Sequence, residues 1–219
     1  MVFKKGLQMK LSLIFPSWTF VFRKMAKVAK GASTFPPLNL AYLAAIAEKA
    51  GHQVQLIDGE AETMNFTDIL EEVKKFSPDL IGLTATTSFF HLVVDYATAL
   101  KKEISARIVV GGPHTTYFRE KVFYECFDYS IIGQCDATFE LFLNELGKGN
   151  LHPDIHGILF RRNSRIGFTG DNPQVSELDS IPFPARHLLK TELYNIGTMR
   201  GRKRYTSIMT SRGCPFSCA

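Results

Sequence analysis

Two cysteines near the end of the sequence, Cys214 and Cys218, have a spacing that could place two thiolates on one loop. They directly follow the tripeptide Ser211-Arg212-Gly213. Thiolates are soft ligands that favour zinc or the iron of an iron–sulfur cluster. A tetrahedral zinc site needs further ligands nearby, and the sequence after Cys218 offers none. The spacing alone therefore makes these two cysteines candidate metal ligands and leaves the metal open.

Small side chains form a second kind of candidate site, because they gather where three predicted strands end. Each cluster offers hydroxyl groups or backbone N–H groups but little charge, which suits a large, amide-decorated neutral ligand better than a phosphate. Tight turns between strands and helices are the alternative explanation for any single cluster. The candidate binding residues are Thr84, Thr86, Thr87 and Ser88 in the first cluster, Gly111, Gly112, Pro113 and His114 in the second, and Gly133, Asp136 and Thr138 in the third.

Two of these candidates have a specific competing interpretation. Asp136 stands just before a predicted helix, where an aspartate often caps the first turn. His114 could be an ordinary polar histidine on a loop or helix surface, and the same holds for His91. Both histidines remain the nearest candidates for a metal-ligating imidazole.

Strands and helices alternate along the part of the chain that carries these clusters. Apolar runs predict strands, and apolar residues at spacings of three and four predict helices. This alternation predicts an α/β fold, a doubly wound five-stranded parallel sheet of the flavodoxin-like order 2-1-3-4-5. Ligands of such sheets bind outside the carboxyl ends of the strands, here between the first and third. The predicted strands are 10–15, 54–58, 80–84, 107–110 and 129–133, and the predicted helices are 36–51, 67–77, 90–100, 116–125 and 139–147.

The pattern changes after residue 150. Residues 155–160 and 166–168 flank a polar turn and predict a β-hairpin outside the sheet. Residues 178–186 contain two prolines and predict an extended linker. We therefore expect a disordered N-terminus over 1–8, a sheet domain over 9–150, a hairpin and linker over 151–200, and the start of another domain over 201–219.

Composition excludes several classes of protein. The chain has 219 residues, of which 45% are hydrophobic and 21% charged, and its formal net charge is +5. Its four cysteines are too few for a disulfide framework, and it lacks the ~20 consecutive apolar residues that would span a bilayer. We expect a cytoplasmic protein without a signal peptide or membrane contact. Nucleic-acid binding through the basic residues is not expected, because aromatic residues do not interleave with them.

Familiar phosphate sites are also absent from the sequence. A G-x-G-x-x-G fingerprint and a Walker loop are both missing. The turn after the first strand lacks the glycine of a flavin phosphate loop. Thr84 stands where a phospho-receiver domain would carry an aspartate.

Four segments together resemble the cobalamin-binding radical SAM proteins. They are residues 36–44 (PPLNLAYLA), 110–114 (VGGPH), 178–186 (LDSIPFPAR) and 211–218 (SRGCPFSC). The resemblance covers residues 9–219 and implies a B12-binding, Rossmann-like domain over 9–150. It also implies that residues 201–219 begin a radical SAM domain.

The resemblance implies two sets of cofactors. Cobalamin would bind base-off, with residues 84–88 against the lower corrin face, residues 111–113 admitting the nucleotide tail and residues 133–138 closing the pocket. A D-x-H-x-x-G loop is missing, since Leu159 stands where Asp154-Ile155-His156 would need a glycine, so we expect no protein histidine on cobalt. Cys214 and Cys218 would be two of the three cysteines that bind a [4Fe-4S] cluster, which cleaves S-adenosylmethionine.

The third cysteine of that C-x-x-x-C-x-x-C motif would fall two residues past Ala219. We therefore expect a truncated chain that is inactive alone, with no catalytic residue of its own and with methyl transfer as the activity of the full-length protein. The alternative is a structural or interaction domain that has lost its cofactor. The substrate and the oligomeric state remain open.

Overall fold

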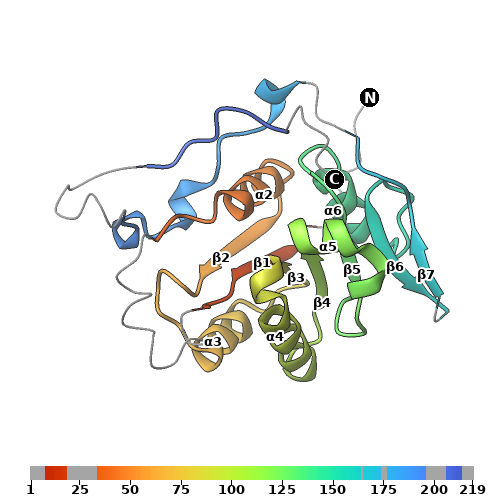
Figure 1. Cartoon of the computed structure of the whole chain (residues 1–219), viewed down its shortest axis with the longest axis horizontal. Helices are drawn as coiled ribbons and strands as arrows, with labels where there is room; N and C mark the ends of the chain where they lie inside the picture. Colours follow the sequence, from red (N-terminus) through yellow and green to blue (C-terminus); the bar gives the residue numbers. More distant parts are fainter. Residues whose placement is uncertain (1–7, 19–33, 164, 174–176, 196–205, 214–219) are drawn as a thin grey trace.

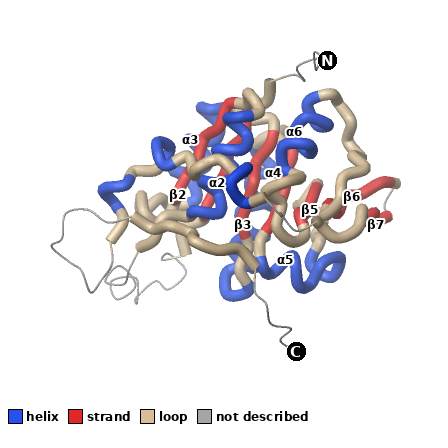
Figure 2. The backbone as a smooth tube through the Cα atoms, turned by 90° about the horizontal axis from the view of Figure 1, so that it is seen from above, coloured by secondary structure: helices blue, strands red, loops and turns tan. Residues whose placement is uncertain are grey.

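The computed structural model describes residues 8–18, 34–163, 165–173, 177–195 and 206–213. Within them the strands form a seven-stranded sheet in the order β2-β1-β3-β4-β5-β6-β7 (Figure 1). Figure 2 shows the sheet from above, with β2 at one end and β7 at the other. β1 to β5 pair in parallel, so the predicted parallel core and its order 2-1-3-4-5 are confirmed. The strands are β1 (Lys10–Phe15), β2 (Gln53–Asp58), β3 (Leu80–Thr84), β4 (Arg107–Gly111), β5 (Tyr129–Ile131), β6 (Ile158–Arg162) and β7 (Arg165–Phe168).

The expectation that the hairpin lies outside the sheet is wrong. β6 pairs antiparallel with β5, and β7 pairs antiparallel with β6. β5 has only three residues, and as an edge strand it would leave one row of backbone N–H and C=O groups unpaired. The hairpin covers that edge and buries Ile158 and Leu159 almost completely. The hairpin is therefore an integral part of the sheet.

Helices cover both faces of the sheet. α2 (Leu38–Lys49) and α6 (Phe139–Gly147) pack on one face, and α3 (Phe66–Phe76) and α4 (Phe90–Glu103) on the other (Figure 1). Because strand side chains alternate between faces, Ile81 and Leu83 pack with α3 and α4, whereas Leu80 packs on the opposite side. Among the described residues, none of the helices combines the length and apolar character that crossing a membrane requires.

Three helices begin at other residues than predicted, and the first of them, α2, begins at Leu38 and not at residue 36. The sequence pattern starts α3 at Thr67, but the capping side chain is Asn65, which accepts hydrogen bonds from the N–H groups of Thr67 and Asp68. Asp68 in turn accepts from the N–H of Asn65, which completes a capping box. The helix predicted over 116–125 begins earlier, as α5 (Pro113–Phe118), because proline suits a first helical turn. A 3₁₀ turn, η3 (Arg119–Val122), follows it.

The predicted linker packs against the sheet domain. The remaining short turns of the described chain are η2 (Thr87–Phe89), η4 (Leu178–Ser180), η5 (Arg186–Leu188) and η6 (Thr191–Leu193). The N–H of Ala185 donates to the carbonyl of Ala41 in α2 at 2.9 Å. The hydroxyl of Tyr194 donates to the Asp58 carboxylate at 2.9 Å. Leu189 and Tyr194 are buried against α2 and β2, so this segment belongs to the folded unit.

Asp58 is a buried carboxyl group at the end of β2. Burial raises the pKa of Asp58, and the hydrogen bonds from the N–H of Ala61 and the hydroxyl of Tyr194 offset part of that rise. The neighbouring Glu60 raises the pKa further. The folded state therefore holds this proton more tightly than the unfolded state does. As pH rises from the ordinary value of 3.8 through the folded-state pKa, the contribution of Asp58 to stability is lost.

We predict that the variant Asp58→Asn flattens this dependence. Its free energy of unfolding should fall less than that of the wild type as pH rises through this window, which urea denaturation at a series of pH values measures. The variant Tyr194→Phe should steepen the dependence, because the folded-state pKa rises when a donor to the carboxylate is lost. It should also cost about 1–2 kcal/mol of stability at neutral pH. Identical slopes for all three proteins would contradict the role assigned to Asp58.

Candidate functional site

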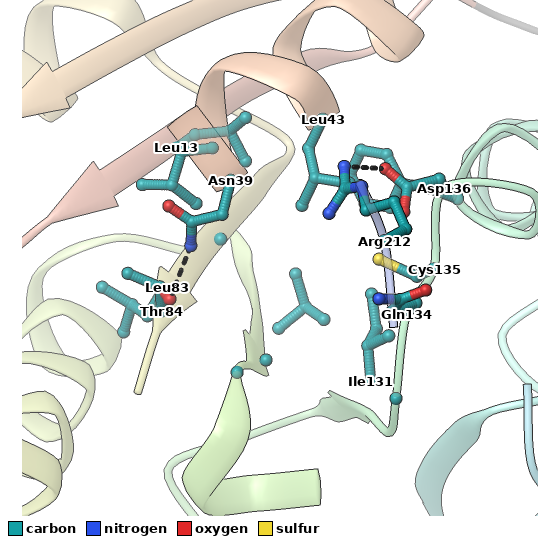
Figure 3. A pocket seen from close by; sticks show the side chains of 17 residues that line it. Leu13, Asn39, Leu43, Leu83, Thr84, Ile131, Gln134, Cys135, Asp136 and Arg212 are labelled. Carbon is teal, nitrogen blue, oxygen red and sulfur yellow. Dashed lines mark hydrogen bonds and ion pairs between the residues drawn. The ribbon is translucent and has the colours of Figure 1, made fainter. Parts of the chain in front are cut away.

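A pocket of about 180 Å³ lies at the carboxyl ends of β3, β4 and β5, beneath the first turn of α2. Figure 3 shows it with Asn39 and Thr84 on one side and Asp136 and Arg212 on the other. Leu13 is the described residue of β1 that lines it, so the pocket lies mainly over β3 to β5 and only borders the predicted crevice between β1 and β3. Apolar side chains form most of its wall, and the lining residues are Leu13, Asn39, Leu40, Leu43, Gly82, Leu83, Thr84, Val109, Gly111, Gly112, Ile131, Gly133, Gln134, Cys135, Asp136, Phe139 and Arg212.

Two glycines of the pocket are there for different physical reasons. Gly112 has a φ of +119°, and a Cβ there would lie 2.5 Å from the carbonyl oxygen of Ala85, so only glycine allows the loops after β3 and β4 to meet. A Cβ at Gly111 would instead have ordinary contacts, with Ile131 at 3.8 Å as its nearest neighbour. Because Gly111 lines the pocket, its missing side chain leaves space for a ligand beside the strand.

The polar groups of the pocket are mostly uncharged or paired. The amide of Asn39 donates to the hydroxyl of Thr84 at 3.0 Å. Arg212 and Asp136 form an ion pair at 3.0 Å. The Cys135 thiol also lines the pocket, and burial, with a smaller contribution from Asp136, raises the pKa of Cys135 to about 12. At neutral pH this cysteine is a protonated thiol and not a thiolate.

The structure brings five of the predicted site residues together. They come from all three predicted clusters, and each of them lines the pocket: Thr84, Gly111, Gly112, Gly133 and Asp136. Parallel strands place their carboxyl ends at one edge of the sheet, which is why loops far apart in the sequence meet here.

The other predicted residues of the first cluster lie outside the pocket wall. Thr86, Thr87 and Ser88 follow β3 and are exposed. The Thr87 hydroxyl lies 3.2 Å from Nδ1 of His114. These side chains are accessible to a ligand larger than the pocket, and their predicted contact with a corrin remains a prediction.

His114 is not a surface histidine, so that interpretation is wrong. Its ring packs between Phe90, at 4.1 Å between ring centres, and Phe118, at 4.6 Å. It is buried, and burial lowers the pKa of His114, which favours the neutral imidazole. Pro113 and His114 open α5 beside the pocket without lining it. His91, by contrast, is exposed on α4, as predicted for a helix-surface residue.

Asp136 does not cap α6, so that interpretation is also wrong. Thr138 occupies the N-cap position, and its side chain makes no capping hydrogen bond. The Asp136 carboxylate binds Arg212 instead, because the guanidinium compensates a carboxylate that is only 7% exposed.

Asn172 fixes the loop between β5 and α6. Its side chain accepts a hydrogen bond from the hydroxyl of Thr138 at 2.7 Å and donates to the carbonyl of Ile132 at 2.8 Å. Thr138 is therefore buried behind the pocket wall, and its role is to hold the loop that carries Gly133 and Asp136.

Two polar lining residues, Asn39 and Arg212, are not among the predicted site residues. Gln134 and Cys135 also line the pocket, and they lie within the predicted stretch 133–138 without being named individually as site residues. Asn39 and Leu43 are four residues apart on α2, and this helical spacing could have shown that they share a face. Arg212 lies 76 positions from Asp136, and local periodicity carries no information on such a pair. Cys214 and Cys218 lie outside the described residues.

Comparison with known proteins gives a match to the B12 binding domain over residues 26–143. An uncharacterized methyltransferase of Pyrococcus horikoshii is 34% identical over 96% of this chain and 44% of its own length. The cytidylyl-2-hydroxyethylphosphonate methyltransferase of Streptomyces wedmorensis is 27% identical over 83% of this chain and 43% of its own length. The chain thus spans less than half the length of these relatives.

Two solved structures share the fold. The cobalamin-dependent S-adenosylmethionine radical enzyme OxsB, with aqua-cobalamin and S-adenosylmethionine bound, superposes with a TM-score of 0.64 at 20% identity, over 83% of this chain and 25% of OxsB. The radical S-adenosylmethionine methyltransferase TsrM of Kitasatospora setae, with cobalamin and a [4Fe-4S] cluster bound, gives 0.59 at 17% identity, over 75% of this chain and 31% of TsrM. The parallel sheet, the glycine-lined pocket at its carboxyl edge and the match over residues 26–143 agree, and the chain belongs to the B12-binding domain family.

Proposed function

We propose that this chain binds cobalamin in the pocket at the carboxyl ends of β3, β4 and β5, as part of a B12-dependent radical SAM methyltransferase. The observation that carries the proposal is the space beside Gly111, which a Cβ would enter without a close contact to the protein. The proposal is further supported by the location of this space within the segment that matches the B12 binding domain.

The pocket suits the flat base at the end of the nucleotide tail of cobalamin. Leu13, Val109, Ile131 and Phe139 give it apolar walls, and apolar walls favour a flat, uncharged ring system over a phosphate. At the rim, the Asn39 side chain is placed to exchange hydrogen bonds with the amide groups that decorate a corrin.

We further propose that cobalamin binds base-off and without a histidine on cobalt. The described residues that line the pocket include no histidine, and the ring of His114 is enclosed by Phe90 and Phe118. Burial raises the pKa of Cys135, which disfavours its thiolate form. Bound cobalamin supplies a cobalt centre that can carry a methyl group, while the protein holds and orients the cofactor.

Methyl transfer, the [4Fe-4S] cluster and S-adenosylmethionine belong to the proposal for the full-length protein. Two relatives are methyltransferases by name, and each extends well beyond the aligned part. Cys214 and Cys218 are the residues of this chain that we propose as cluster ligands. We assign no catalytic residue to the described part of the chain.

Binding of cobalamin can be tested directly. We expect the purified chain to retain an equimolar amount of cobalamin after incubation with hydroxocobalamin and desalting, with the visible spectrum of the base-off form. A colourless protein would contradict the proposal and favour a domain without cofactor. A retained cofactor with a base-on or histidine-ligated spectrum would contradict only the proposed ligation state.

The variant Gly111→Val tests the location of the site. The valine side chain should fill the space beside β4 and weaken cobalamin binding by about tenfold or more, measured by spectral titration. Its thermal unfolding should stay close to that of the wild type, because the nearest neighbour of the new Cβ lies at 3.8 Å. Thr98→Val, an exposed position on α4, is the control. Equal affinities for Gly111→Val and the control would place the cofactor elsewhere.

A further inference from the structure

Arg212 lines the pocket although it lies far outside the segment that matches the B12 binding domain, residues 26–143. Its Nη2 donates to Oδ1 of Asp136 at 3.0 Å, and its guanidinium carbon lies 5.0 Å from the ring centre of Tyr42. Figure 3 shows the guanidinium beside Asp136 and Leu43, at the rim of the pocket. Arg212 therefore connects α2 with the loop after β5.

The segment that carries Arg212, residues 206–213, is held at a second point. Nη2 of Arg186 donates to the carbonyl of Ser207 at 2.7 Å. Arg186 belongs to η5, next to Leu189, which is buried in the cluster on α2. The segment is thus bound near one end by Arg186, through Ser207, and near the other end by Asp136 of the pocket, through Arg212.

The ion pair between Asp136 and Arg212 is largely buried. The side chains are 7% and 20% exposed, so water screens the pair only weakly. Among the described residues that line the pocket, these two carry the formal charges, and together they leave the pocket neutral. If Arg212 left, the pocket would contain a buried carboxylate without a partner, which is unfavourable for the protein and for a neutral ligand.

We propose that Arg212 is a binding residue of the cobalamin site and that docking of residues 206–213 is thermodynamically coupled to cobalamin binding. This inference rests on the proposed function. Arg212 completes the pocket wall, so a ligand in the pocket contacts the sheet and this segment together. The guanidinium has more N–H donors than the bond to Asp136 uses, and carbonyl oxygens of the corrin amides are suitable acceptors. Coupling is reciprocal: cobalamin stabilises the docked segment, and the docked segment raises the affinity for cobalamin by the same factor.

The coupling would reach the proposed cluster motif, because only Gly213 separates Arg212 from Cys214. The same ion pair that closes the cobalamin pocket would then fix the chain position at which the cluster-binding loop begins.

The test uses the full chain and measures two quantities. The first is the affinity for hydroxocobalamin, and the second is hydrogen–deuterium exchange of the amides of residues 206–213 with and without it. We expect hydroxocobalamin to slow exchange in this segment of the wild type. In Arg212→Gln the affinity should fall about tenfold, and the slowing should be lost. Lys101→Gln, which breaks the Lys101–Asp128 ion pair of 2.9 Å away from the pocket, should behave as the wild type does.

In Arg212→Gln alone, the buried carboxylate of Asp136 loses its partner, and this could destabilise the fold. The double variant Asp136→Asn/Arg212→Gln removes that carboxylate, so it separates the loss of a ligand contact from a loss of folding. We expect it to bind cobalamin as weakly as Arg212→Gln does, because the contact of Arg212 with the ligand is still missing. Recovery of wild-type affinity in the double variant would overturn the inference, since Arg212 would then only neutralise Asp136. The inference would also be overturned if Arg212→Gln bound hydroxocobalamin as tightly as the wild type and the ligand slowed exchange in residues 206–213 to the same extent. That result would leave the proposed function intact. A wild-type chain that binds no cobalamin would overturn both.

Discussion

The close approach of the loops after β3 and β4 is the constraint on which the site depends. The N–H of Ala85 donates to the carbonyl of Gly111 at 2.7 Å, and the N–H of His114 donates to the carbonyl of Ala85 at 3.2 Å. Gly112 stands between these bonds in a conformation that disfavours a side chain. Backbone hydrogen bonds thereby join the two strand ends. Because no side chain at Gly112 separates the two loops, they stay close together at the edge of the sheet where the pocket lies.

The pocket combines apolar walls with a small number of polar groups at its rim. Its floor comes from strand residues, its roof from the first turn of α2, and its charged rim from a loop and a distant C-terminal segment. Among the described lining residues, formal charge is confined to Asp136 and Arg212, which cancel, and burial keeps the thiol of Cys135 protonated. Such a surface can hold a large neutral molecule through shape and hydrogen bonds, and it offers little attraction to a free anion.

The parts of the fold that could be predicted are those that depend on short stretches of the sequence. Buried runs such as 107–110 and the stripes of the helices are visible in periodicity, and the parallel pairing follows from the alternation of strands and helices. The order 2-1-3-4-5 does not follow from that alternation, because doubly wound sheets occur in more than one order. The pairing of the hairpin with β5 could not be predicted, because antiparallel edge pairing depends on which backbone groups remain unpaired in space. The same reason explains why the sequence predicts that Asp136 caps the helix beside it and gives no sign of its pairing with Arg212. His114 is polar by type, but its burial comes from Phe90 and Phe118, whose convergence the sequence does not display.

Asn172 has a consequence for where this folding unit ends. Its side chain connects the chain after β7 to Ile132 and Thr138 by hydrogen bonds. These two residues lie at the ends of the loop that brings Gly133 and Asp136 to the pocket. The segment that matches the B12 binding domain stops at residue 143, before β6, β7 and Asn172. The structure that supports the pocket is therefore longer than the family segment, because Asn172, which follows the hairpin, holds the loop that carries Gly133 and Asp136.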